Sequence, residues 1–165
     1  MTLIMIRFYH PFFTSRETTM RTTITTLLMI CTLLFANAHA GEHQKPGHLL
    51  TVLTAESDHT LAMGLILTRH YLAEGGTAQV LLCDAAAELA LKESNTGSAV
   101  VQPAGVSARQ MLGGLIEAGV KVEVCAIFLP NREETADDLR KGVGVAGPAA
   151  IAAVMAAPNT RLFTP

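Results

Sequence analysis

Residues 107–128 read SARQMLGGLIEAGVKVEVCAIF and contain one complete predicted helix followed by one strand. Ser107 is a favoured N-cap residue, and Gly119 suits the end of a helix that closes at Ala118. The run 121–128 that follows is rich in residues that favour strands. Its apolar side chains fall on both faces, which is typical of a strand that is covered by helices on both sides.

Strands and helices alternate in the same way along most of the chain. Ser57, Asp58 and Thr60 are suited to cap the first helix, and residues 93–106 form the longest expected loop. The pattern predicts a parallel sheet with helices on both faces. Strands are expected at residues 48–54, 78–83, 121–128, 143–146 and 160–163, and helices at 61–73, 85–92, 107–118, 136–141 and 148–157.

Residues 20–40, MRTTITTLLMICTLLFANAHA, have the layout of a secretory signal peptide. A basic start precedes a short apolar core, and small residues at alternate positions end at Ala40. The core is shorter than the roughly 20 apolar residues that span a bilayer, which argues against an uncleaved anchor. Cys31 lies inside the core without a small residue before it, so a lipid-attachment site is rejected. Residues 1–19 are interpreted as an upstream extension, with Met20 as the start.

Composition limits what the exported domain, residues 48–165, can do. The 125 residues after Ala40 carry nine Lys and Arg and thirteen Asp and Glu, a net charge of −4. No basic patch appears, so nucleic acid is not expected as a partner, and no membrane contact is expected after cleavage. Two cysteines remain, which is too few for a disulfide-stapled scaffold.

Cys125 is the first candidate for chemistry because it lies near the carboxyl end of its predicted strand. Open α/β sheets bind ligands beyond the carboxyl ends of their strands. A thiol there is a nucleophile if a cation or a helix N-terminus favours its thiolate, and Arg132 is the nearest candidate cation. The alternative is a buried cysteine that packs as a small hydrophobe.

Cys83 is the candidate second thiol, at the end of the strand 78–83. The carboxylate of Asp84 directly after it disfavours a thiolate, so Cys83 is the weaker nucleophile. If the second and third strands are neighbours, the two sulfurs can come close enough to pair. The sequence does not fix the register, and the pairing stays open.

The other motifs have simpler explanations. Gly142, Gly144 and Gly147 spell G-x-G-x-x-G, but they follow the fourth strand rather than the first, so turn and packing roles are favoured over dinucleotide binding. No cofactor is expected. His43, third in the polar leader 41–47, could complete a square-planar copper or nickel site, but a flexible leader is the favoured interpretation. No G-x-S-x-G elbow supports a serine hydrolase.

The order of several segments resembles the DsrE/DsrF-like family, which includes sulfur-relay proteins. The similarity covers residues 48–163, and its most specific part is GVKVEVCAIFLPNR at 119–132. The other matching segments are an early helix containing residues 62–67, the glycine pair 75–76 before AQVLLCD, the helix MLGGLIEAG, and DLRKGVGVAGPAAIAAVM near the end.

The resemblance implies a three-layer α/β/α fold with a five-stranded parallel sheet, in which the second and third strands are neighbours. It also implies a homo-oligomer, commonly a trimer or hexamer. In some sulfur-relay members a cysteine at the position of Cys125 carries a persulfide. The cytosolic relay partners are not implied for an exported chain.

Three functions follow as hypotheses for a periplasmic or secreted protein. In the first, Cys125 carries sulfane sulfur as a persulfide between a donor and an acceptor thiol. In the second, the protein is a non-catalytic oligomeric binding module with structural cysteines. In the third, Cys83 and Cys125 act together in thiol–disulfide chemistry.

Overall fold

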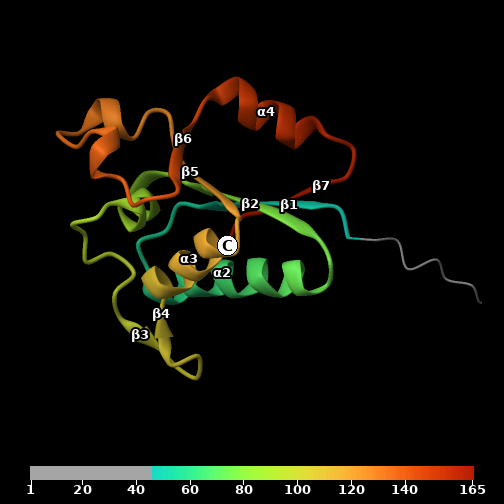
Figure 1. Ribbon diagram of the computed structural model, residues 1–165, viewed down its shortest axis with the longest axis horizontal. Coiled ribbons are helices and arrows are strands. Elements are labelled where there is room, and N and C mark those ends of the chain that lie inside the picture. Colours follow the sequence, from blue (N-terminus) through green and yellow to red (C-terminus); the bar gives the residue numbers. More distant parts are fainter. Residues whose placement is uncertain (1–45) are drawn as a thin grey trace, which may run out of the picture. The chain divides into compact units, whose positions relative to one another are not determined.

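A single five-stranded parallel sheet forms the centre of the computed structural model, which describes residues 46–165 (Figure 1). Its strands run in the order β6-β5-β2-β1-β7, and every pairing is parallel. This confirms the fold class expected from the alternating pattern. The strands are β1 (His48–Leu53), β2 (Thr77–Leu82), β5 (Lys121–Cys125), β6 (Val143–Ala146) and β7 (Thr160–Phe163).

Helices cover both faces of the sheet and make a three-layer α/β/α arrangement. Figure 1 shows α2 (Asp58–Ala73) and α3 (Ala108–Glu117) together on one face and α4 (Pro148–Ala156) on the other. Shorter elements connect these layers. They are the 3₁₀ helices η2 (Asp84–Ala90), η3 (Leu129–Asn131) and η4 (Ala136–Asp138), and an antiparallel pair, β3 (Val100–Val101) with β4 (Val106–Ser107).

The main core lies between the sheet and the α2–α3 layer. Alternate residues of each strand point to this side, and each fully buried aliphatic side chain contributes about 1.5–3 kcal/mol. One polar pair is buried with them: the hydroxyls of Thr51 and Thr68 are 2.7 Å apart. Fully buried members of this core include Leu53, Leu61, Leu65, Val80, Leu82, Leu89, Leu112, Val122 and Val124.

The α4 layer is much thinner. Leu50, Leu81 and Ala146 form a small buried cluster on this face, against which Ile151 and Val154 pack. No residue of α4 is buried, although its sequence, PAAIAAVMA, is apolar throughout. A helix that is apolar on all sides is normally buried. The fold therefore leaves an apolar helix exposed to solvent.

Four segments differ from the sequence prediction, one of them the helix expected at 136–141, which is the short 3₁₀ helix η4. The strand expected at 121–128 ends at Cys125, because the N–H of Phe128 turns back to the carbonyl of Cys125 at 2.9 Å. The helix expected at 85–92 is a 3₁₀ helix, η2. The loop expected at 93–106 contains most of the β3–β4 pair. Short apolar runs do not specify these details.

Helix starts follow the expected chemistry in two of three cases. Ser107 and Gln110 form a reciprocal capping box at the start of α3. Thr135 and Asp138 do the same for η4, although that helix ends at Asp138 rather than at 141. Ser57 is the N-cap of α2, but its side chain makes no capping hydrogen bond.

Candidate functional site

Cys83 and Cys125 lie opposite each other at the carboxyl edge of the sheet. Strand β2 pairs with β5 so that Leu82 is opposite Val124, and each cysteine is the next residue along its chain. The two Cα atoms are 5.2 Å apart, and the structure joins the sulfurs as a disulfide. This separation is within the range that a disulfide needs. The register that the sequence left open therefore brings the two thiols together.

Both cysteines point to the thinly covered face of the sheet. They are half-buried and pack against the small cluster under α4, which includes Leu81 and Ala146. Ala146 is opposite Cys125 in the β5–β6 pairing, and α4 begins two residues later. The disulfide thus lies under one apolar helix rather than in the main core.

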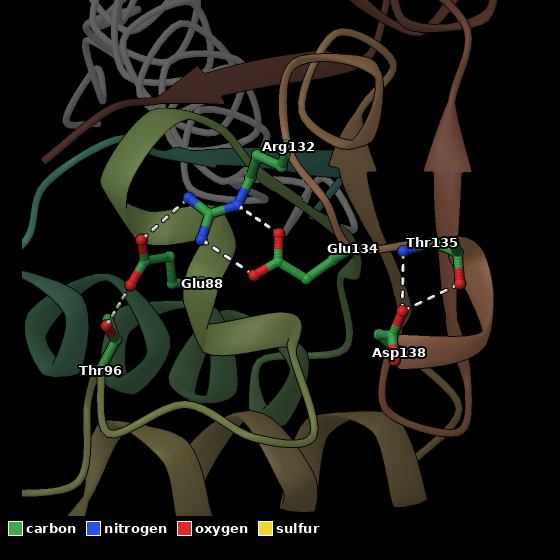
Figure 2. A network of polar contacts seen from close by, with 6 residues as sticks. All are labelled: Glu88, Thr96, Arg132, Glu134, Thr135 and Asp138. Atoms are coloured by element: carbon green, nitrogen blue, oxygen red, sulfur yellow. Dashed lines mark hydrogen bonds and ion pairs between the residues drawn. The ribbon is translucent and has the colours of Figure 1, made fainter.

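The two chain segments that follow the cysteines are joined by an ion-pair cluster. Arg132, downstream of Cys125, is 3.0 Å from Glu88 in η2 and 2.9 Å from Glu134 (Figure 2). The guanidinium also lies over the ring of Phe128, 4.9 Å from its centroid. The hydrogen bond to Glu134 is the main cause that raises the pKa of Arg132, and the same bond lowers the pKa of Glu134.

Backbone hydrogen bonds join the same two segments a second time. The N–H of Arg140 donates to the carbonyl of Ala90 at 2.8 Å, and the N–H of Lys92 donates to Asp138 at 2.9 Å. Leu91 and Leu139 form an isolated antiparallel bridge between them. Residues 84–92 and 129–140 are therefore held together without help from the disulfide. This arrangement keeps the strand ends, and so the two cysteines, close to each other.

Asp84, directly after Cys83, has a φ of +51°. In the described part of the chain it is the one residue other than glycine with a positive φ. Aspartate tolerates this left-handed conformation better than most residues, but it is still uncommon and often occurs at functional sites. It turns the chain sharply from β2 into η2, which carries Glu88.

The remaining predicted site residues have different outcomes. The guanidinium of Arg132 is bound to two carboxylates, so its role as support for a Cys125 thiolate stays a prediction. His43 lies outside the described residues. Within residues 46–165, no group of three His, Cys, Asp or Glu could hold a metal ion. No helix in that same range is long and apolar enough to cross a membrane.

Glu88 was not singled out by the sequence. It lies among alanines in a short run, DAAAELA, and the opposite charge at helical spacing is Lys92, four residues on, rather than Arg132. Its salt bridge to Arg132 spans 44 residues along the chain. The pairing of β2 with β5 and the backbone bonds between residues 84–92 and 129–140 bring the two together.

Comparison with known proteins shows the same fold at low sequence identity. A protein of unknown function from Methanobacterium thermoautotrophicum, MTH1491, superposes with a TM-score of 0.57 and 16% identity over 72% of this chain and 98% of its own. The ychN protein from E. coli superposes with a TM-score of 0.57 and 17% identity, over 73% and 99% of the two chains. At these identities the likeness shows the fold alone.

No protein-family model matches the sequence. No curated protein matches it either. The chemistry of the site therefore has to be argued from its own residues.

Proposed function

We propose that Cys83 and Cys125 form a reversible dithiol–disulfide centre in an exported protein. The observation that carries the proposal is the disulfide itself, which joins the carboxyl ends of two adjacent parallel strands. Open α/β sheets bind their ligands at this edge. The third of the three functional hypotheses is thus the one that the geometry supports best.

The reaction is a two-electron exchange with a dithiol partner. One thiolate of the partner attacks a sulfur of the Cys83–Cys125 bond and forms a mixed disulfide, and the other cysteine leaves as a thiolate that takes up a proton. The second thiol of the partner then displaces the remaining cysteine and is oxidised to a disulfide with the first. The protein ends with two thiols, and each step conserves atoms and electrons.

Two features support reversibility rather than a permanent cross-link. The ion pair of Arg132 with Glu88 and the backbone bonds between residues 84–92 and 129–140 do not involve the cysteines, so reduction would leave these contacts in place. Both cysteines are half-buried rather than enclosed in the main core. The reduced thiols therefore stay positioned to pair again.

A second candidate function uses the reduced state. Cys125, at the end of β5, would attack the outer sulfur of a persulfide donor and hold it as Cys125–S–SH, while the donor leaves as a thiolate. The position of Cys83 favours this chemistry, because its thiolate could displace the sulfane sulfur as hydrosulfide and form the observed disulfide. A dithiol reductant would then restore both thiols.

We further propose that copies of the chain assemble through α4. The helix exposes apolar side chains, including Met155 at 52%, and Leu162 on the neighbouring strand β7 is 53% exposed. Assembly would bury this surface. It fits the trimer or hexamer expected from the resemblance, and export fits the oxidising conditions in which disulfides persist.

The test is mass spectrometry of the exported protein after trapping of free thiols. A reversible centre predicts no free thiol as isolated and two after mild reduction of the folded protein. Persulfide carriage predicts that reduced Cys83→Ser, which cannot release the sulfur as hydrosulfide, keeps an adduct of about 32 Da after exposure to a sulfane-sulfur donor, and that Cys125→Ser forms none. A disulfide that is reduced only in urea would indicate that the two cysteines are structural, and it would contradict the proposal.

A further inference from the structure

We propose that the loop 92–98 and Arg109 form a binding site for a small oxyanion of the phosphate or sulfate type. This site is separate from the cysteine pair and goes beyond the proposed function. A surface cavity of about 480 Å³ opens there, and every side chain that lines it is polar or charged. Its lining residues are Lys92, Glu93, Ser94, Asn95, Ser98 and Arg109.

Within residues 46–165, no carboxylate forms an ion pair with Lys92 or Arg109, although the charge of Lys92 contributes to lowering the pKa of Asp138. Three ion pairs occur among residues 46–165, and they involve only Lys121 and Arg132 as cations. The Lys92 ammonium donates to the carbonyl of Asp137 instead. Arg109 donates through Nη2 to the carbonyls of residues 91 and 92, at 2.7 and 2.6 Å. Carbonyl oxygens accept these bonds without cancelling the charge.

Arg140, which does not line the cavity, places a third positive charge next to Arg109. Its Nη1 donates to the carbonyl of Arg109 at 3.1 Å, so the two guanidinium-bearing residues are neighbours. Burial first, and then the charge of Arg109, lower the pKa of Arg140. Two adjacent arginines that lack carboxylate partners create a local positive potential, which an anion would relieve.

Arg109 also has a donor without an acceptor. Its Nη1 is buried and has no hydrogen-bond partner among the described residues. Nearly all buried donors in folded proteins are paired, so an orphaned guanidinium N–H marks a place where an acceptor is missing. Arg109 lines the cavity, but its Nη1 is enclosed, so an oxyanion there would supply the acceptor only if the guanidinium turned toward the opening.

The loop that carries the other donors is already ordered by its own hydrogen bonds. Thr96 donates through its hydroxyl to Glu88, as Figure 2 shows, and its N–H donates to the hydroxyl of Ser94. The carbonyl of Gly97 accepts from the N–H of Arg109 at 2.8 Å. A preformed loop loses little conformational freedom on binding, which favours affinity for a small ligand.

Glu93 is the one acidic residue in the lining. Changing the charge in the cavity should therefore raise or lower the affinity for an oxyanion, depending on the sign of the change. Glu93→Gln removes a repelling charge and should tighten binding, whereas Ser98→Glu places a new negative charge in the cavity and should weaken it. Ser98 is exposed and its side chain makes no hydrogen bond among the described residues, so the variant should fold normally. Ser57→Glu, an exposed serine outside the cavity, is the matched control.

The experiment is a titration with inorganic phosphate followed by backbone amide chemical shifts, at constant ionic strength. We expect saturable shifts confined to residues 92–98 and 109. The dissociation constant should fall roughly threefold or more in Glu93→Gln, rise by a similar or larger factor in Ser98→Glu, and stay unchanged in Ser57→Glu. Shifts that do not saturate, or binding that is equal in all four proteins, would overturn the proposal.

Discussion

Cys83 and Cys125 are separated by 42 residues of sequence, and the disulfide between them closes that segment into a loop. In the chain-entropy account, closing a loop of this length restricts the unfolded chain by roughly 4 kcal/mol, and measured effects are typically about 2–4 kcal/mol. The cross-link thus stabilises the fold in addition to any redox role.

We predict that the double variant Cys83→Ala/Cys125→Ala has a free energy of unfolding about 2–4 kcal/mol lower than the oxidised protein. The loss arises because the unfolded chain regains the freedom that the cross-link removed. Urea unfolding measures it, and the reduced wild-type protein is the control. Equal stability of the double variant and the oxidised protein would show that the disulfide does not form in solution.

The carboxylate of Glu134 gives the ion-pair cluster a dependence on pH. Its pKa is lowered mainly by the hydrogen bond from Arg132. A group whose pKa is lower in the folded state stabilises the fold above its ordinary pKa of 4.5, and that contribution is lost as the pH falls through the lowered value. Both side chains are about one-third exposed, so the effect should be modest.

We therefore predict that Arg132→Gln is less stable than the wild type at neutral pH and that the difference shrinks as the solution is acidified below pH 4.5. Unfolding free energies measured across this range test it. Lys141→Gln, which removes an exposed cation, should show no such dependence. A difference between Arg132→Gln and wild type that is constant with pH would contradict the role of the cluster.

At the scale of single elements, Gly142 before β6 shows a local requirement of the fold. Its φ is +90°, and an added Cβ would collide with the side chain of Ile116 on α3. Gly114, inside α3, has open space around the same position. The first glycine is needed for the turn, and the second is not.

We predict that Gly142→Ala destabilises the protein by about 1–3 kcal/mol, because alanine is strained at a positive φ and also meets Ile116. In contrast, Gly114→Ala should stabilise it by up to about 1 kcal/mol, since alanine is the better helix former. Thermal unfolding of both variants measures the two signs. The same sign for both would be inconsistent with this account of the β6 turn.

Most elements could be predicted because their patterns are local. The cap at Ser107, the stop at Gly119 and the proline that opens α4 each act within one turn of their helix. The end of β5 was missed, since Ala126 and Ile127 continue the apolar run and nothing in it signals the turn after Cys125. Tertiary contacts decide where such a run leaves the sheet.

The candidate site was predictable only in part. Both cysteines stand out in the sequence, but their pairing depends on the β2–β5 register, which is set by packing of the whole sheet. The salt bridge from Arg132 to Glu88 and the buried N–H of Arg109 depend on chain segments that meet only after folding. Long-range contacts of this kind leave no periodic signal.

At the scale of the whole molecule, the two faces of the sheet are covered unequally. Two helices and a deep core cover one face, while α4 alone lies on the other and remains exposed. Apolar helices of this kind usually mark a contact with another chain. We interpret the α4 face as the surface through which copies of the protein assemble.

We predict that the wild-type protein is an oligomer and that Met155→Glu on α4 makes it a monomer, because a charge buried at an apolar contact costs several kcal/mol. Met63→Glu on α2 is the matched control, since the two methionines are 52% and 53% exposed. Size-exclusion chromatography with light scattering gives the mass of each variant. A monomeric wild type, or a Met155→Glu variant that assembles normally, would exclude the α4 interface.

The central claim is that the Cys83–Cys125 disulfide opens and closes in the folded protein. Equilibration of the purified protein in graded dithiol–disulfide buffers, with thiol trapping and intact-mass readout, tests it most directly. The same spectrum shows whether residues 20–40, the predicted signal peptide with Cys31, are absent. We predict a single two-electron transition between zero and two trapped thiols, with the fold retained. Its midpoint potential should lie above about −300 mV, because structural disulfides typically have reduction potentials below that value. A disulfide that stays closed until the protein unfolds, or two thiols that never pair, would contradict it.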